Sequence, residues 1–114
     1  MSVNVEALNV NTLFPQMVEA GKSAAGAGWD EIRTTVRIEL KVLAKRLKEL
    51  AKAVASGEFD EEDARMYFIG IRNNTIAAIA LVTNAVHIAA EKIINAVLDV
   101  IKQAVNTALG FSLY

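Results

Sequence analysis

Residues 36–63 read VRIELKVLAKRLKELAKAVASGEFDEED, and this stretch contains most of one helix, a turn and the start of another helix. Its apolar residues alternate in spacings of four and three, a mean period of 3.5 that is typical of a coiled-coil seam. These seam residues are Val36, Leu40, Leu43, Leu47, Leu50 and Val54. Gly57 follows the seam and suits the left-handed cap that ends a helix. Asp60 and Asp63 match the spacing of a capping box, so a second helix is predicted from about residue 60.

Both helices extend well beyond this stretch. The first begins near Trp29, and the second contains no proline and a single glycine. At 1.5 Å per residue the first would be about 40 Å long and an unbroken second helix about 70 Å. We therefore predict an all-α fold, a long antiparallel helical hairpin over 29–114 with arms 29–56 and 60–109 and an apolar C-terminal tail. A break within 70–75 would shorten the second arm.

The region 1–28 has a different pattern from the hairpin. Residues 1–11 alternate apolar and polar positions, which suits an extended arm. A short helix is predicted over 12–20, with Pro15 in its first turn, where a missing N–H costs nothing. The glycine-rich run GKSAAGAG at 21–28 then predicts a hinge or a tight turn.

The composition indicates that such a hairpin associates with other molecules. Apolar residues make up 54% of the chain even without glycine, whereas average soluble domains contain about 45–50% with glycine counted. Two helices cannot cover so much apolar surface by packing only on each other. The surplus predicts self-association into a homo-oligomeric helical bundle, or contact with a membrane. The tail residues Phe111, Leu113 and Tyr114 are expected to insert into a partner.

The centre of the second arm is the expected oligomer interface. Residues 73–90, NNTIAAIALVTNAVHIAA, contain no charged side chain, and a helix that is apolar nearly all round is normally buried in a large core or in lipid. Alanines spaced by seven, four and seven residues would let another helix approach closely, beside larger apolar side chains. The predicted interface comprises Ala78, Ala85, Ala89, Ala96, Ile79, Val82, Val86 and Ile93.

A polar stripe is predicted along the same arm. Asparagines recur there every eleven residues, which is almost three helical turns, so they would lie on one nearly straight line. The stripe comprises Asn73, Asn84, Asn95 and Asn106, with His87 assigned to it. His87 is the only histidine, and although Glu91 follows one turn later, no second histidine completes a metal site. We therefore expect no metal and no other cofactor.

Charge and local motifs argue against several functional classes. The net charge of −1 provides no overall field to attract nucleic acid, so no nucleic-acid partner is expected. Basic residues between Arg33 and Lys52 alternate with acidic ones along the chain, which is typical of a solvated helix face. The acidic run 60–63 is interpreted as helix capping, because the central glycine and distal glutamate of a calcium loop are missing. The sequence GKS at 21–23 lacks the upstream glycine of a phosphate-binding loop.

No constellation of residues supports a reaction. The predicted function is that of a non-enzymatic structural or interaction protein, a self-assembling helical bundle that could belong to a larger bacterial or phage-type assembly. A membrane-active or membrane-associated helical protein is the first alternative, although three asparagines, two threonines and a histidine make 73–90 a poor membrane span. A ferritin-like ligand- or metal-binding bundle is the second. A cytoplasmic location is the default expectation, since the N-terminus shows no signal-peptide pattern.

Overall fold

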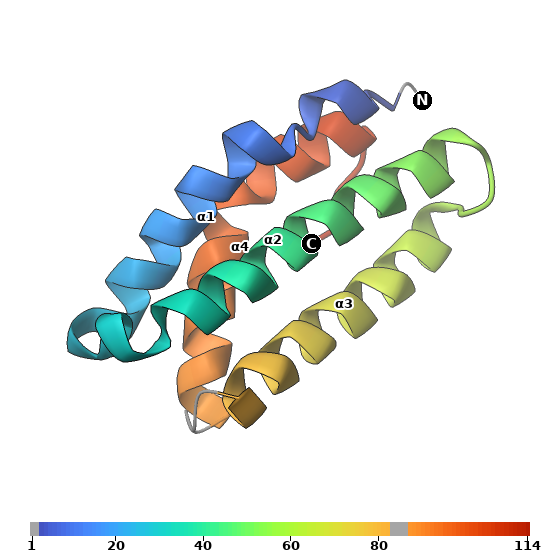
Figure 1. The fold of residues 1–114 in the computed structure, drawn as a ribbon. Coiled ribbons are helices and arrows are strands. Elements are labelled where there is room, and N and C mark those ends of the chain that lie inside the picture. The colour runs from blue at the N-terminus through green and yellow to red at the C-terminus, as the bar shows by residue number, and fades with distance from the viewer. Residues whose placement is uncertain (1–2, 83–86) are drawn as a thin grey trace.

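The computed structural model describes residues 3–82 and 87–114, and the regular structure within these residues is all helical (Figure 1). This confirms the predicted all-α class. The elements are η1 (Val5–Ala7), α1 (Val10–Ala25), η2 (Gly26–Gly28), α2 (Trp29–Ala55), α3 (Glu61–Val82) and α4 (His87–Leu109), where η marks a 3₁₀-helix.

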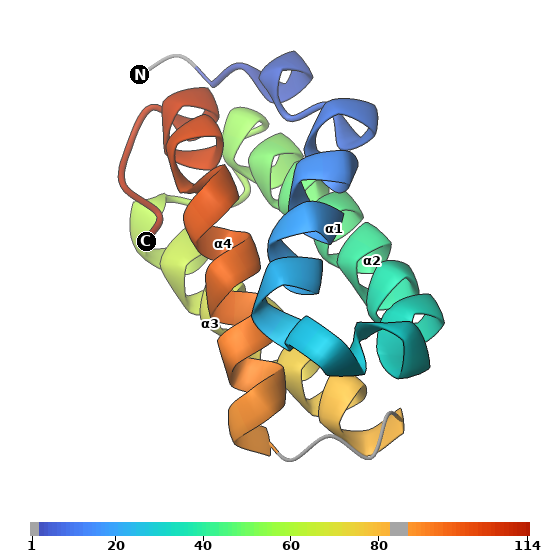
Figure 2. The ribbon, with the colours of Figure 1, turned by 90° about the vertical axis from the view of Figure 1, so that its left-hand side faces the viewer.

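The four long helices form one bundle. α1 lies beside α2, α2 beside α3 and α3 beside α4, and α4 returns beside α1, so that each helix has two main neighbours (Figures 1 and 2). All four contribute apolar side chains to a single core. One copy of the chain therefore buries much of the apolar surface that a chain of this composition has to shield from water.

The seam of α2 faces this core, as its spacing predicts. Five of the six seam residues are buried and the last, Val54, is half-buried. The helix ends as expected at Gly57, whose φ of +84° is the left-handed conformation that glycine adopts most easily. The chain then turns, and α3 runs back alongside α2 (Figure 1).

The predicted capping box at the start of α3 is confirmed. The N–H of Asp63 donates to Asp60 Oδ1 at 2.8 Å, and the N–H of Asp60 donates to Asp63 Oδ2 at 3.2 Å. Each carboxylate thus satisfies a main-chain donor that the helix itself leaves without a partner.

The prediction of one unbroken arm over 60–109 is wrong, because α3 and α4 are separate helices that lie side by side. Arg72 Nη2 donates a hydrogen bond to Asn95 Oδ1 at 2.8 Å, whereas these residues would be about 35 Å apart in a straight helix. No break occurs within 70–75, since α3 is continuous there. Folding back lets the apolar faces of α3 and α4 bury one another inside a single chain.

The extended N-terminal arm predicted over 1–11 is also wrong where the structure describes it. Val5–Ala7 forms η1, which contacts α4, and the N–H of Asn4 donates to the Ala108 carbonyl oxygen at 2.8 Å. Leu8 is buried. The alternating apolar residues thus pack a short helical segment onto the bundle instead of forming a strand.

α1 is longer than the helix predicted over 12–20, and the expected hinge is largely helical. Gly21 is buried within α1, where a Cβ atom would lie 3.5 Å from Leu40 Cδ1 and 3.6 Å from Val97 Cγ2. A methyl group would fit at these ordinary contact distances, whereas a large side chain would force α1 away from α2 and α4. The change of direction is confined to η2, where Gly26 has a φ of +64°.

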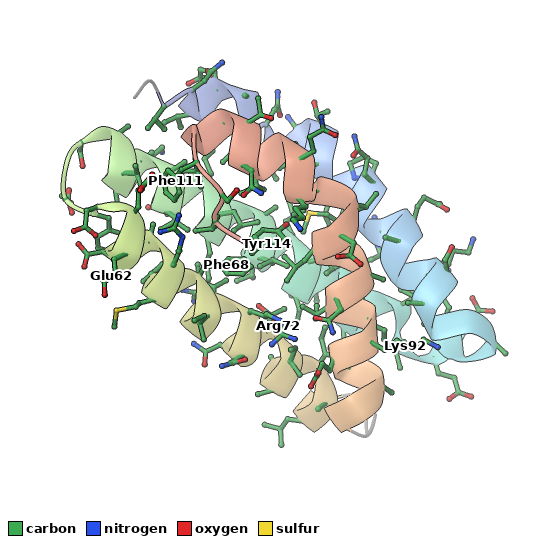
Figure 3. All side chains as sticks on the ribbon, turned by 180° about the vertical axis from the view of Figure 1, so that it is seen from behind. Glu62, Phe68, Arg72, Lys92, Phe111 and Tyr114 are labelled. Atoms are coloured by element: carbon green, nitrogen blue, oxygen red, sulfur yellow. The ribbon has the colours of Figure 1, made fainter. Side chains whose placement is uncertain are left out.

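The C-terminal tail packs on its own chain, so the expectation that it inserts into a partner is wrong. The rings of Tyr114 and Phe68 stack with their centroids 4.6 Å apart (Figure 3). The Tyr114 hydroxyl donates to the Leu98 carbonyl oxygen at 2.6 Å. Leu113 is buried, and the Arg65 guanidinium lies over the Phe111 ring. The tail thus closes the space between α3 and α4.

Candidate functional site

Part of the predicted oligomer interface lies inside the bundle. Ile79 and Ile93 are buried in the core of their own chain, so they offer no surface to a second copy. Ala78, Ala89 and Ala96 are half-buried. Ala85 and Val86 lie outside the described residues, and for Val82 the structure describes the backbone alone.

The predicted polar stripe is not a single line. Asn73 lies on α3, whereas Asn95 and Asn106 lie on α4, so the eleven-residue repeat is divided between two helices. Asn84 lies outside the described residues, and for His87 the structure describes the backbone alone. The asparagines share no common surface in the described part of the chain, because an eleven-residue spacing aligns them only along one unbroken helix.

Two of these asparagines instead form hydrogen bonds with Arg72, whose side chain lies between α3 and α4 (Figure 3). Arg72 donates through Nη2 to Asn95 and through Nη1 to Asn73 Oδ1 at 3.3 Å, and its Nη2 lies 3.9 Å from Glu91 Oε1. The cluster is partly open to solvent. The cluster is a charged hydrogen-bond network that links the two helices. Exposed contacts of this kind contribute modestly to stability.

Asn106 has a role that the sequence did not indicate, because it holds the tail. Its Oδ1 accepts from the Leu113 N–H at 2.8 Å, and its Nδ2 donates to the Tyr114 main-chain oxygen at 3.0 Å. Burial, and secondarily the charge of Asp99, raises the pKa of the Tyr114 hydroxyl well above its usual value. That hydroxyl is therefore a structural hydrogen-bond donor.

The described residues include no group of three or more His, Cys, Asp or Glu side chains that could hold a metal ion. Every buried side-chain nitrogen or oxygen in the same residues has a hydrogen-bond partner, as Thr75 shows by donating to the Ile71 carbonyl oxygen at 2.8 Å. The candidate functional features of the described residues are two groups of exposed side chains.

The first such surface is the outward side of α3, which we call the α3 face. It consists of Met66, Gly70, Asn73, Ala77 and Leu81, spaced by four, three, four and four residues and all exposed. Met66 is 67% exposed and Leu81 is 84% exposed, and Ile69 beside the face is 57% exposed. The spacing is present in the sequence, but a single helix over 60–109 places the expected interface on its alanines instead.

The second surface is a line of cations on α2, which we call the basic stripe. It consists of Arg33, Arg37, Lys41, Lys45, Lys48 and Lys52, of which only Lys48 is half-buried and the others are exposed. Among the residues that the structure describes, none of the six has a carboxylate oxygen within 4.0 Å of its cationic nitrogens. The side chains of Arg37 and Lys41 lie over the ring of Phe14, at 5.4 and 5.5 Å from its centroid.

A search for membrane-spanning elements gives a negative result for the part of the chain described here, since none of its helices is both long and apolar enough to cross a bilayer.

Comparisons with protein families, with curated proteins and with solved structures find no match to this chain.

Proposed function

We propose that this protein is a non-enzymatic interaction protein that associates with a second copy of itself through the α3 face. The observation that carries the proposal is an exposed face of five uncharged residues, with a large apolar side chain at each end and small residues between them. Exposed apolar surface of this kind, with polar residues around it, marks interaction sites on soluble proteins. The only charged side chain between Arg65 and Glu91 is that of Arg72, which is turned toward α4.

The order of residues on the α3 face suits a two-fold axis. Gly70 and Ala77 lie equally far from the midpoint between Asn73 and Asn74, and Met66 and Leu81 do so as well. When two copies of α3 cross in antiparallel directions at this midpoint, each Gly70 faces an Ala77 and each Met66 faces a Leu81. A two-fold interface requires this kind of self-complementary patch.

The chemistry of the pairs fits the same arrangement. Gly70 has open space around it, and small residues at the centre allow two helices to approach to about 8 Å. Asn73 would meet Asn74 of the other copy, where paired amides can hydrogen-bond and fix the register, as a single asparagine does in coiled coils. The large residues at both ends would then cover apolar surface that each copy now exposes.

The size of the face implies a weak dimer. Burying Met66 and Leu81 in both copies is worth about 1.5–3 kcal/mol for each side chain. Association costs about 4–15 kcal/mol in lost translational and rotational freedom. The free energy gained by burying these side chains exceeds the cost of association only over part of the two ranges. We therefore expect a Kd of about 1–100 µM, which is typical of a transient interface.

Sedimentation equilibrium over a concentration range that brackets this Kd tests the proposal. The native chain should pass from monomer to dimer, and Ala77→Glu should remain a monomer because it would place two like charges in the contact. Ala104→Glu, at an exposed position of α4, is the matched control with the same change in charge and should dimerise normally. A native chain that stays monomeric throughout, or an Ala77→Glu variant that dimerises like the control, would refute the α3 interface.

A further inference from the structure

We infer that the basic stripe of α2 is a docking surface for an anionic lipid bilayer, with headgroup phosphates as its ligands. This inference is independent of the proposed dimer, because it rests on a different helix.

The cations of the stripe lie on one side of the helix, even though basic and acidic residues alternate in the sequence. Its six cations are spaced by four, four, four, three and four residues from Arg33 to Lys52, a length of about 28 Å. At about 100° per residue they occupy a sector of roughly 120°, and Glu39 falls on the opposite side of the helix. Glu49 lies about 100° from the centre of the sector. The cations from Arg33 to Lys52 therefore share one side of the helix, although they alternate with acidic residues along the chain.

Nearby acidic groups do not neutralise the stripe. Asp60 and Asp63 use their carboxylates to cap α3. Glu19 of α1 lines the same hollow as Arg37 but forms no ion pair with it within 4.0 Å, and Asp30 lies before the first cation of the stripe. The cationic heads thus face solvent, and Phe14 holds two of them in place through its ring.

The surroundings of α2 favour a flat partner over a nucleic acid. α1 and α3 flank α2 on its two sides (Figure 1), so the helix cannot enter a major groove about 12 Å wide. Proteins that bind single strands present exposed aromatic rings for base stacking, whereas Phe14 is half-buried and lies under two cations. A row of exposed cations along one helix instead suits the plane of a membrane surface.

Two exposed aliphatic side chains next to the stripe support the same choice. Ile38 is 57% exposed and Val42 is 37% exposed, and both lie on the α2 surface adjoining Lys41 and Lys45. Aliphatic side chains gain from contact with the acyl boundary beneath the headgroups, but have no partner on a phosphate backbone. Surface docking of this kind needs no membrane-spanning helix.

Co-sedimentation with vesicles tests the inference. The native chain should bind vesicles of phosphatidylcholine mixed with phosphatidylglycerol, should not bind phosphatidylcholine alone, and should be released by high salt. Each basic residue near an anionic surface strengthens binding about fivefold. The triple variant Lys41→Gln, Lys45→Gln and Lys52→Gln should therefore bind about a hundredfold more weakly.

A matched variant tests whether binding depends on the position of the cations or only on the net charge of the protein. Arg46→Gln, Lys92→Gln and Lys102→Gln also remove three exposed cations, but from outside the stripe, and this variant should bind the anionic vesicles within a few-fold of the native chain. Circular dichroism verifies that both variants keep their helices. Equal losses in the two variants, or no binding of the native chain to anionic vesicles, would overturn the inference. Tighter binding to a labelled DNA duplex or single strand than to the vesicles would overturn the choice of a bilayer.

Discussion

Replacing Asn106 with alanine removes the side chain that holds the C-terminal tail against α4. The variant loses the bond accepted from the Leu113 N–H and the bond donated to the Tyr114 main-chain oxygen, at 2.8 and 3.0 Å. Both bonds are partly buried, so the two main-chain groups would be left poorly solvated. Leu113 and the stack of Tyr114 on Phe68 lie in the same segment and depend on its position.

The expected destabilisation follows from these contacts. Each hydrogen bond contributes about 0.5–1.5 kcal/mol net, and an orphaned buried group can cost more. Because water still reaches part of the site, we expect Asn106→Ala to lower the free energy of unfolding by about 2 kcal/mol. For a chain of this size that corresponds to a decrease in Tm of roughly 8 °C.

Urea unfolding followed by circular dichroism measures the effect. The midpoint should fall while the dependence of the unfolding free energy on urea stays unchanged, which indicates a loss of stability and not of compactness. Asn95→Ala is the control, since Asn95 is exposed and loses a hydrogen bond from Arg72 at the surface. We expect it to cost less than about 1 kcal/mol. Equal midpoints for the two variants would show that the tail is not held by Asn106.

Two further predictions concern the core. The unfolded chain loses the Tyr114 proton near pH 10, whereas burial raises the pKa of this hydroxyl in the folded chain; stability should therefore fall as the pH rises above about 10. Tyr114→Phe should reduce that fall in alkaline unfolding curves, and an unchanged slope would contradict the assigned burial. Gly21→Ala should be neutral or stabilising by up to about 1 kcal/mol, because its Cβ would lie at ordinary contact distances. Gly21→Leu should destabilise by about 1–3 kcal/mol through overpacking, and equal thermal stabilities of the two Gly21 variants would argue against the close helix approach.

Local sequence signals predicted the elements best where each signal has one physical cause. The seam of α2, the glycine at its end and the Asp60–Asp63 cap depend on residues close together in the chain, and the structure contains all three. The end of α3 has no comparable signal. Between Arg72 and Glu91 the chain has neither proline nor glycine, so helix propensity alone favours continuation.

The functional surfaces were harder to predict, because tertiary packing determines which face of each helix is buried and which is exposed. The buried positions of Ile79 and Ile93 follow from α4 lying beside α3 and α1, an arrangement that spacing within one helix cannot reveal. Asn106 likewise acts on a tail whose path is set by tertiary packing. The cations of α2 were identified correctly as exposed, but their separation from the acids appears only when positions are projected around the helix.

The return of α4 beside α1 has a consequence for the order of folding. The pairs α1–α2, α2–α3 and α3–α4 join neighbours in the chain, whereas the α1–α4 pair joins the first long helix to the last. Closing that contact fixes the ends of a long loop, and its entropic cost must be met before the contact is gained. We expect the consecutive pairs to form early and the α1–α4 pair to complete the bundle, so that substitutions in this last contact mainly accelerate unfolding.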